Sequence, residues 1–356
     1  MKPLFIWAGG KNKMLKHYKD ILPDQKEIDS YVEPFFGGGA MFIYMKNNYD
    51  LKKYYINDIN PSIVSIYECI KNEYKPFEKR LKELEKEYLS LGNYPTKVVS
   101  KPGFLMTAED KVVERDIRIL KDKRKKFYLD VRHKHAYDYE SWTKPYEAGT
   151  LYFLMKTGFN GIFQMNKNTN GRYGTPSGLL NQKDKVFDYG VIKWWNKNLK
   201  NVEIGCGNWN DNIPEWENAF YFFDPPYRDS FANYGNAFSD DQLKEMIEFA
   251  NSRKYVFLSN RDGDDGWFDK KKLGLSIERF PITYTAGRRK QIKKGDKIEK
   301  FEAKKATEIL LYKPKKKNKP KKKKQGTMID SLYSICSYIL NKVFIKPDIS
   351  KKYSIA

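Results

Sequence analysis

One tetrapeptide combines a carboxylate, a rigid backbone and an aromatic ring: Asp224–Tyr227, with the sequence Asp-Pro-Pro-Tyr, directly after the apolar run of residues 220–223. An apolar run that stops at two prolines is typical of a buried parallel strand with an abrupt end. Prolines donate no hydrogen bond, so the backbone after Asp224 is extended and its carbonyls can accept. Ligands bind at such strand ends in open α/β sheets. Taken alone, the tetrapeptide also fits a simple strand-terminating turn.

Two further motifs follow predicted strands upstream. The run Phe35–Gly39 contains three glycines between a strand and a helix, where the backbone can approach a ligand closely. It lacks the G-x-G-x-x-G spacing of a dinucleotide site. Asp58 ends the next strand, 21 residues after Gly37, where a carboxylate can accept hydrogen bonds from both hydroxyls of a ribose. Together with Asp224, these motifs indicate a ligand site better than they indicate tight turns and a helix cap.

The hydrophobic pattern alternates short strand-like runs with helix-like ones, which predicts an α/β fold with a Rossmann-like sheet. The predicted strands are residues 31–36, 53–57, 200–205, 218–223 and 255–259, and the predicted helices are residues 39–46, 61–71, 74–91, 109–128, 149–156 and 239–252. Residues 159–178 are rich in Gly and Asn and predict a hairpin or loop. Residues 276–312 predict a closing β-hairpin around a basic loop.

Composition favours a polyanionic partner. The 356 residues carry a formal net charge of +22, and eight of the positive charges lie in the lysine run of residues 315–324. Nucleic acid is the leading partner, and a lysine-rich surface without a specific role is the alternative. Three cysteines at wide spacing fit a reducing compartment. We expect no signal peptide and an intracellular location with DNA, in cytoplasm or nucleus.

No metal site is expected from the sequence. The pair His133 and His135 lacks further ligands of suitable spacing, and the cysteines form no cluster. Residues 313–326 predict a disordered Lys/Pro-rich linker. Residues 327–356 have apolar positions at helical spacing interrupted by polar ones. They predict an amphipathic tail that docks on a partner protein, on the folded body or on a membrane surface, and not a membrane span.

The motifs, taken in order, resemble those of Dam-type DNA adenine N6-methyltransferases, the D12 class of the alpha group. The resemblance rests on five segments and runs from residue 2 to about residue 313: Phe5–Lys11, Val32–Gly39, Tyr55–Asn60, Phe159–Gly161 and Asp224–Tyr227. It implies a catalytic methyltransferase domain of residues 1–75 and 185–312. An inserted, mainly helical and hairpin target-recognition region would occupy residues 76–184.

The resemblance implies S-adenosyl-L-methionine as the methyl donor. It assigns these contacts: Trp7 and Lys11 at the methionine end, Phe36, Gly37 and Gly39 in the loop beside it, Asp58 at the ribose, Asp224 near the cationic sulfonium, and Trp209 as a candidate beside the adenine. An anionic Asp224 favours a neighbouring cation, which agrees with this assignment.

The implied chemistry is direct methyl transfer to the exocyclic amino group of adenine. Asp224 and the carbonyl of Pro225 would each accept one N–H of that group and aim its lone pair at the methyl group. Tyr227 would stack on an adenine extruded from the duplex. Asp as the first residue of the tetrapeptide favours adenine N6 over the alternative, cytosine N4. An inactive DNA-binding or scaffold homologue is the other alternative.

Sequence recognition is assigned to the segment after residue 158. The resemblance implies that Phe159, Asn160 and Ile162 enter double-stranded DNA beside the target, with Phe159 or Ile162 in the space left by the flipped base. A core position for Phe159 is the alternative. Gln164 stands where GATC-specific members carry arginine. Glutamine pairs better with adenine, and the alternative is that Gln164 contacts no base, so GATC is not predicted. Candidate phosphate contacts are Arg172, Lys167 and residues 288–290.

Overall fold

The computed structural model describes residues 1–7, 9–95, 107–228, 238–263, 265–270, 273–284, 290–294, 297–302 and 304–314. Residues 1–314 form one compact unit. The predicted tail of residues 327–356 and nearly all of the predicted linker lie outside the described residues.

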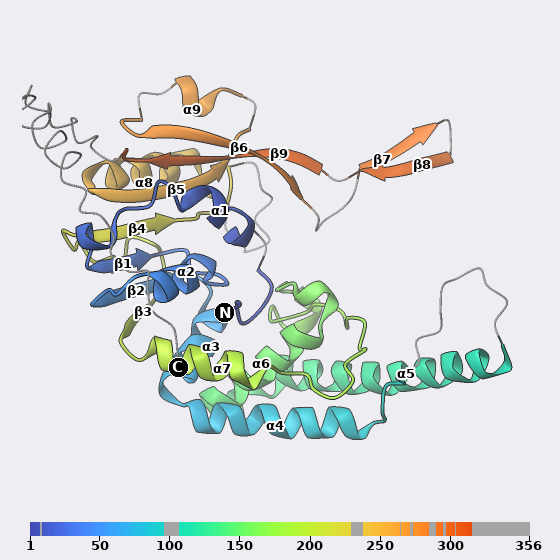
Figure 1. Cartoon of the computed structure of the whole chain (residues 1–356). Helices are drawn as coiled ribbons and strands as arrows, with labels where there is room; N and C mark the ends of the chain where they lie inside the picture. The colour runs from blue at the N-terminus through green and yellow to red at the C-terminus, as the bar shows by residue number, and fades with distance from the viewer. Residues whose placement is uncertain are drawn as a thin grey trace, which may run out of the picture. The chain divides into compact units, whose positions relative to one another are not determined.

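The described part of the chain builds a seven-stranded sheet of order β3-β2-β1-β4-β5-β9-β6 (Figure 1). Its strands are β1 (Ser30–Glu33), β2 (Lys53–Asp58), β3 (Val202–Cys206), β4 (Ala219–Phe223), β5 (Tyr255–Arg261), β6 (Ser276–Tyr284) and β9 (Lys304–Tyr312). Strands β1 to β5 are parallel, whereas β9 runs antiparallel to both β5 and β6. A separate hairpin pairs β7 (Lys290–Lys294) with β8 (Lys297–Glu302). The predicted Rossmann-like α/β fold is therefore confirmed.

The order of the sheet places the switch in chain direction between β1 and β4. The chain moves outward from β1 through β2 to β3 and then returns to β4 on the other side of β1. Val32 of β1 lies opposite Tyr221 of β4, so Pro34 and Asp224 leave neighbouring strands at the same edge. Open α/β sheets bind ligands at this kind of edge.

Helices cover both faces of the sheet. They are α1 (Leu15–Tyr18), α2 (Ala40–Asn48), α3 (Pro61–Asn72), α4 (Tyr74–Ser90), α5 (Ala108–Tyr137), α6 (Lys144–Thr157), α7 (Tyr189–Leu199), α8 (Asp240–Ser252) and α9 (Trp267–Lys270). All five residues of β4 are buried. Phe220 and Phe222 belong to one core with α2, α3, α6 and α7, whereas Tyr221 and Phe223 belong to a second core with α8. Burial on both faces explains why β4 has a continuous apolar sequence.

Several boundaries differ from the sequence-based prediction for local reasons. Strand β1 ends at Glu33, not at residue 36, because Pro34 cannot donate to the ladder. Helix α5 has 30 residues and begins at a Thr107 capping box. Helix α7 was not predicted, although Asp188 caps it and its buried residues recur at helical spacing. The predicted closing hairpin is confirmed as the antiparallel pair β6 and β9.

Candidate active site

Asp224 stands at the end of β4 and is held by two donors. The Lys11 ammonium lies 2.5 Å from Asp224 Oδ1, and the Ser259 hydroxyl donates to the same oxygen at 2.8 Å. Ser259 belongs to the neighbouring strand β5 and is fully buried. Both contacts are to Oδ1, so they fix the plane of the carboxylate without engaging Oδ2.

Lys11 links Asp224 to Tyr227 and Glu308. Its Nζ donates to the Tyr227 hydroxyl at 2.9 Å, and that hydroxyl donates to Glu308 Oε1 at 2.8 Å. Burial of Lys11 lowers its pKa, but the charges of Asp224 and Glu308 outweigh this effect and raise the pKa overall. An ammonium that is only 2% exposed therefore stays charged because carboxylates surround it.

Glu308 is a site residue that the sequence-based prediction missed. It lies in β9 directly before the buried apolar residues 309–311, is 3% exposed and has one buried oxygen, Oε2, without a partner among the described residues. Burial raises its pKa, and the nearby Lys11 charge lowers it in part. A glutamate within a buried strand is the signal that could have revealed it, since an ionised side chain is rarely buried without a partner.

The glycine loop is tied to the end of β2 through Asp58. The Gly37 amide donates to Asp58 Oδ2 at 2.8 Å, and the Asn60 amide donates to Oδ1 at 2.9 Å. Burial raises the pKa of Asp58, and these two hydrogen bonds lower it in part. A β-carbon at Gly37 would lie 2.5 Å from the Trp7 indole, so only glycine fits there. The predicted residues Trp7, Gly37 and Asp58 are thus brought together.

Two aromatic residues assigned to the cofactor have core positions. The Phe36 ring is 3% exposed and packs on Tyr67 with ring centroids 4.8 Å apart. Trp209 is 7% exposed and packs edge-on against Phe223 and Phe249. Of Phe36 only the backbone belongs to the glycine loop, because its side chain fills the core.

Residues 158–178 form the predicted hairpin. The backbone bridges Gly158–Ser177 and Met165–Tyr173 join its two limbs. We call residues 159–166 the outer limb and residues 172–178 the inner limb. The outer limb is exposed at the four positions assigned to DNA contact, which are Phe159, Asn160, Ile162 and Gln164. Phe159 is 50% exposed, so the alternative of a core aromatic is wrong.

Arg172, a predicted phosphate contact, pairs with residues of the protein itself in the absence of DNA. Its guanidinium pairs with Glu147 of α6 and lies 3.4 Å from the ring centroid of Tyr139. Its side chain is 20% exposed. This ion pair holds the guanidinium against α6, and the contact of Arg172 with a DNA phosphate stays a prediction. Lys167 is exposed, whereas Arg288, Arg289 and the side chain of Lys290 lie outside the described residues.

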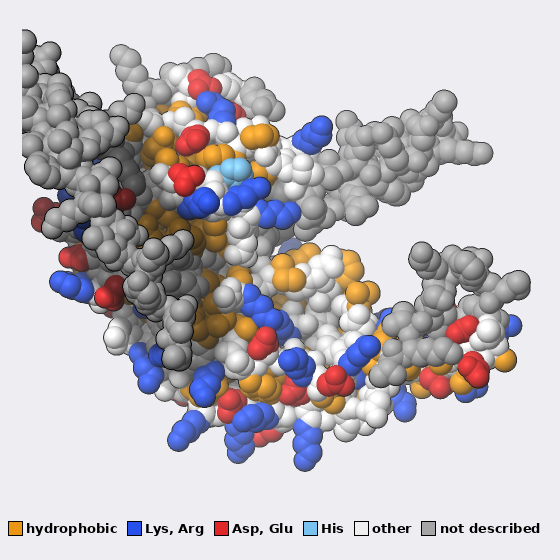
Figure 2. Space-filling view, in the orientation of Figure 1, with side chains coloured by type: hydrophobic (Ala, Val, Ile, Leu, Met, Phe, Trp, Pro, Cys, Tyr) orange, Lys and Arg blue, Asp and Glu red, His pale blue; other side chains and the backbone are white. Residues whose placement is uncertain are grey.

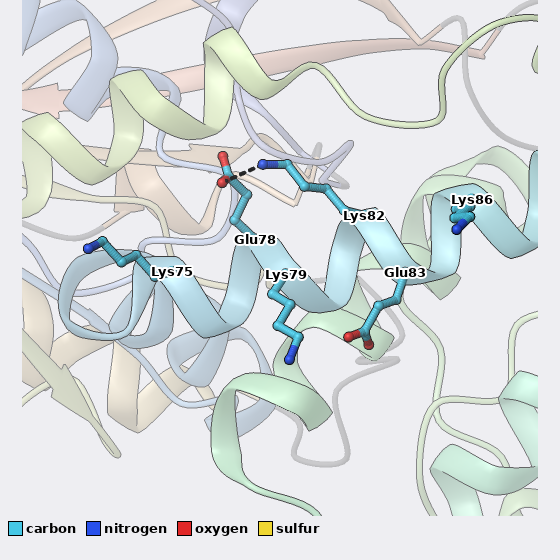
Figure 3. A pocket seen from close by; sticks show the side chains of 6 residues that line it. All are labelled: Lys75, Glu78, Lys79, Lys82, Glu83 and Lys86. Carbon is cyan, nitrogen blue, oxygen red and sulfur yellow. Dashed lines mark hydrogen bonds and ion pairs between the residues drawn. The ribbon is translucent and has the colours of Figure 1, made fainter.

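Surface features elsewhere do not define a second site. A shallow hollow along α4 is lined by lysine and glutamate side chains, and Glu78 pairs with Lys82 at 2.8 Å across it (Figure 3). This is a solvated helix face. In Figure 2, Lys and Arg side chains are spread over the face drawn with acidic ones among them.

Within the described residues no group of three or more His, Cys, Asp or Glu side chains could hold a metal ion. No helix of the described segments is long and apolar enough to cross a membrane.

Comparison with known proteins places this geometry in a family. The model of the D12 class N6 adenine-specific DNA methyltransferases matches residues 7–278. The chain belongs to this family of DNA-modifying enzymes, which confirms the predicted adenine-specific DNA methyltransferase. The Type II methyltransferase M.MjaIII of Methanocaldococcus jannaschii is 31% identical over 83% of this chain and 95% of its own length.

Other relatives are more distant but cover similar spans. The Type II methyltransferase M.CviBI of Paramecium bursaria Chlorella virus NC1A is 26% identical over 71% of this chain and 80% of its own length. A DNA adenine methylase of Salmonella typhi is 24% identical over 80% of this chain and 91% of its own length. Each of these two matches covers far more of the chain than the tetrapeptide Asp224–Tyr227.

Proposed function

We propose that this protein transfers the methyl group of S-adenosyl-L-methionine to N6 of adenine at a specific sequence in double-stranded DNA. One observation carries the proposal: Asp224 stands at the switch point of the sheet with Oδ1 fixed by Lys11 and Ser259. A carboxylate held in this way is preorganised to accept a hydrogen bond from an amino group through Oδ2.

The residues around the glycine loop fit the cofactor. Gly37 and Gly39 have positive φ angles of 47° and 66°, and Gly37 packs directly on Trp7. Asp58 retains lone pairs for ribose hydroxyls beyond its two backbone donors. Ile59, which follows it, is 49% exposed and offers an apolar surface for the adenine, a role that buried Trp209 is poorly placed to fill. When bound, the cofactor supplies an electrophilic methyl group.

Asp224 and Pro225 position the amino group of the target adenine. Each accepts one N–H, which draws the N6 lone pair out of conjugation with the ring and towards the methyl group. With S-adenosyl-L-methionine bound, the N–C bond would form as the C–S bond breaks, and Asp224 would accept the proton lost from N6. Lys11 stabilises Asp224 as the anion until that transfer. The chain's own contribution is orientation and charge, and no covalent enzyme intermediate is required.

Tyr227 holds the target base. Its hydroxyl is fixed between Lys11 and Glu308, which sets the plane of the ring. A tyrosine ring fixed at one end can stack on a base extruded from the duplex. Glu308 therefore acts as a positioning residue for Tyr227.

The outer limb supplies recognition. Phe159 or Ile162 fills the space left by the flipped adenine, Asn160 contacts the DNA beside that space, and Gln164 reads a neighbouring base. The exposure of all four side chains supports these roles. Glutamine favours adenine over guanine, so the proposal does not include GATC as the recognised sequence.

We extend the proposal to the organisation of the chain. Residues 1–75 and 185–312 carry catalysis, and residues 76–184 carry recognition. The linker of residues 313–326 and the tail of residues 327–356 alter location or nonspecific DNA affinity through a partner protein or surface, and not the chemistry.

One experiment tests the function directly. The protein is incubated with labelled S-adenosyl-L-methionine and duplex DNA, and the nucleosides are then separated. We expect labelled N6-methyladenine. Label in N4-methylcytosine would replace adenine by the alternative target, and absence of label from DNA would refute the proposal.

A further inference from the structure

Helix α5 contacts the recognition hairpin and the residues that follow it, and three of the contacting side chains lie on one face of the helix. A further contact runs from the Tyr137 hydroxyl, at the end of the helix, to the carbonyl of Asn168. Arg124, Tyr128 and Arg132 follow one another at four-residue spacing, which places them in a row along the helix. All three donate hydrogen bonds to backbone carbonyls of residues 174–182. We call these three residues the donor row.

The donor row satisfies backbone carbonyls of an irregular segment in which Gly174, Thr175 and Leu180 are buried. Arg124 is fully buried and donates to the carbonyls of Leu180 and Gln182 at 3.0 and 2.7 Å. Tyr128, also fully buried, donates to the carbonyl of Thr175 at 2.8 Å. Buried carbonyls outside regular structure need such partners.

Arg132 and Tyr128 donate hydrogen bonds to the inner limb of the hairpin. Arg132 donates to the carbonyls of Gly174 and Thr175 at 3.2 and 2.9 Å. The Tyr128 hydroxyl would lie 3.1 Å from a β-carbon at Gly158, so helix and hairpin are in close contact. The helix therefore holds the inner limb directly.

The same two inner-limb residues hold the outer limb. The Gly174 amide donates to the carbonyl of Gln164 at 2.8 Å, and the Thr175 hydroxyl donates to the carbonyl of Ile162 at 2.8 Å. A continuous chain of hydrogen bonds thus runs from α5 through Gly174 and Thr175 to the backbone of the two residues proposed to contact bases.

We propose that Tyr128 and Arg132 are positioning residues for DNA sequence specificity. They fix the position of the outer limb relative to α5. Discrimination between bases depends on that position because the hydrogen bonds from the outer limb to the bases weaken steeply with misalignment. This inference rests on the proposed recognition role of the outer limb. It assigns no contact with DNA to Tyr128 or Arg132 themselves.

The test compares three variants with the wild-type protein on a duplex library of random sequence, with N6-methyladenine mapped at each site. Tyr128→Phe removes one hydroxyl and keeps the ring, and Arg132→Met removes the guanidinium. Lys126→Met removes a positive charge from an exposed position of the same helix and serves as the control. The measured quantity is the ratio of initial rates at the preferred site and at sites with one base changed.

We expect the ratio to fall about tenfold in Arg132→Met and about threefold in Tyr128→Phe, as the loss of about one to two hydrogen bonds implies. The rate of a single turnover at saturating preferred DNA stays within about twofold of wild type, since the transfer site is untouched. Lys126→Met keeps the wild-type ratio, and any loss of affinity it causes is equal at all sites.

The inference is overturned if both variants keep the wild-type ratio, or if they lose rate equally at every site. Tyr128→Phe decides the matter if Arg132→Met fails to fold. The wild-type reaction separates this result from the proposed function. Absence of N6-methyladenine there would overturn the function, whereas a selective wild-type enzyme with unchanged ratios in the variants overturns only the role of α5.

Discussion

The active site and the recognition hairpin are held in place by different kinds of contact. At the end of β4, side chains bind side chains, as Lys11 does with Asp224 and Tyr227. In the hairpin, side chains of α5 bind backbone carbonyls. A backbone contact does not depend on the residue type it supports. The outer limb can therefore change its side chains, and with them the DNA sequence read, without losing its position. Asp224 and Tyr227, in contrast, depend on the side chains of Lys11, Ser259 and Glu308.

Variants in these two regions should show two kinds of defect. Changes at the strand ends should reduce methylation of every DNA sequence alike. Changes in the hairpin or in α5 should alter which sequences are methylated. Single substitutions in each region test this difference between loss of rate and change of sequence preference.

Asp224→Ala should lower the single-turnover rate by about a thousandfold or more, because it removes the acceptor that orients the adenine amino group. Cofactor binding measured by calorimetry should remain within a few-fold of wild type. The matched control is Glu203→Ala, which removes an exposed carboxylate from β3. Activity within tenfold of wild type in Asp224→Ala would remove Asp224 from the mechanism.

Gln164→Ala should change sequence preference by about tenfold or more at one base position, as expected for loss of a bidentate base contact. Methylation mapping on random duplexes measures this change. Lys167→Ala removes an exposed charge from the end of the same hairpin and should weaken binding equally for all sequences. If Gln164→Ala instead weakens binding equally for all sequences, as expected for Lys167→Ala, Gln164 does not read a base.

Glu308→Gln should lower the rate about fivefold at alkaline pH and less near neutrality, as expected when a charged neighbour is lost. The amide can still accept from Tyr227, so the change removes mainly charge. Because Glu308 helps to raise the pKa of Lys11, its neutralisation lowers that pKa. Lys11 then loses its proton at a lower pH, and the basic limb of the pH–rate profile shifts towards neutrality. Parallel profiles for variant and wild type would contradict this coupling.

His135 should make the recognition region sensitive to acid. Burial, with a smaller effect of the Arg172 charge, lowers the pKa of His135 to about 3. The unfolded chain therefore binds a proton near pH 6.5 that the folded chain does not, so stability is complete above about pH 6.5 and falls as the pH drops towards 3. His135→Leu should show a smaller fall in melting temperature between pH 7 and pH 4.5 than wild type. The exposed His133→Leu should match wild type.

Local sequence patterns were sufficient for the fold class and for the motifs at the strand ends. The apolar run of β4, stopped by Pro225, predicts a buried strand with Asp224 at its end because both signals act over a few residues. The same holds for Gly37, whose glycine run between a strand and a helix predicts a close approach of the backbone and which has a positive φ angle of 47°. The family resemblance then supplied the chemistry expected at those positions.

The partners of these residues were decided by the tertiary structure. Lys11 and Asp224 are 213 residues apart in sequence, and Tyr227 and Glu308 are 81 apart. Tyr227 and Glu308 meet because the order of strands places β9 beside β5 and β5 beside β4, and Lys11 reaches Asp224 from a short helical turn that precedes the sheet in sequence. Arg172 is a further case, since its ion pair with Glu147, 25 residues away in sequence, follows only from the packing of the hairpin on α6. Residue types and spacing determine which groups can react, whereas long-range packing decides which of them are close enough to do so.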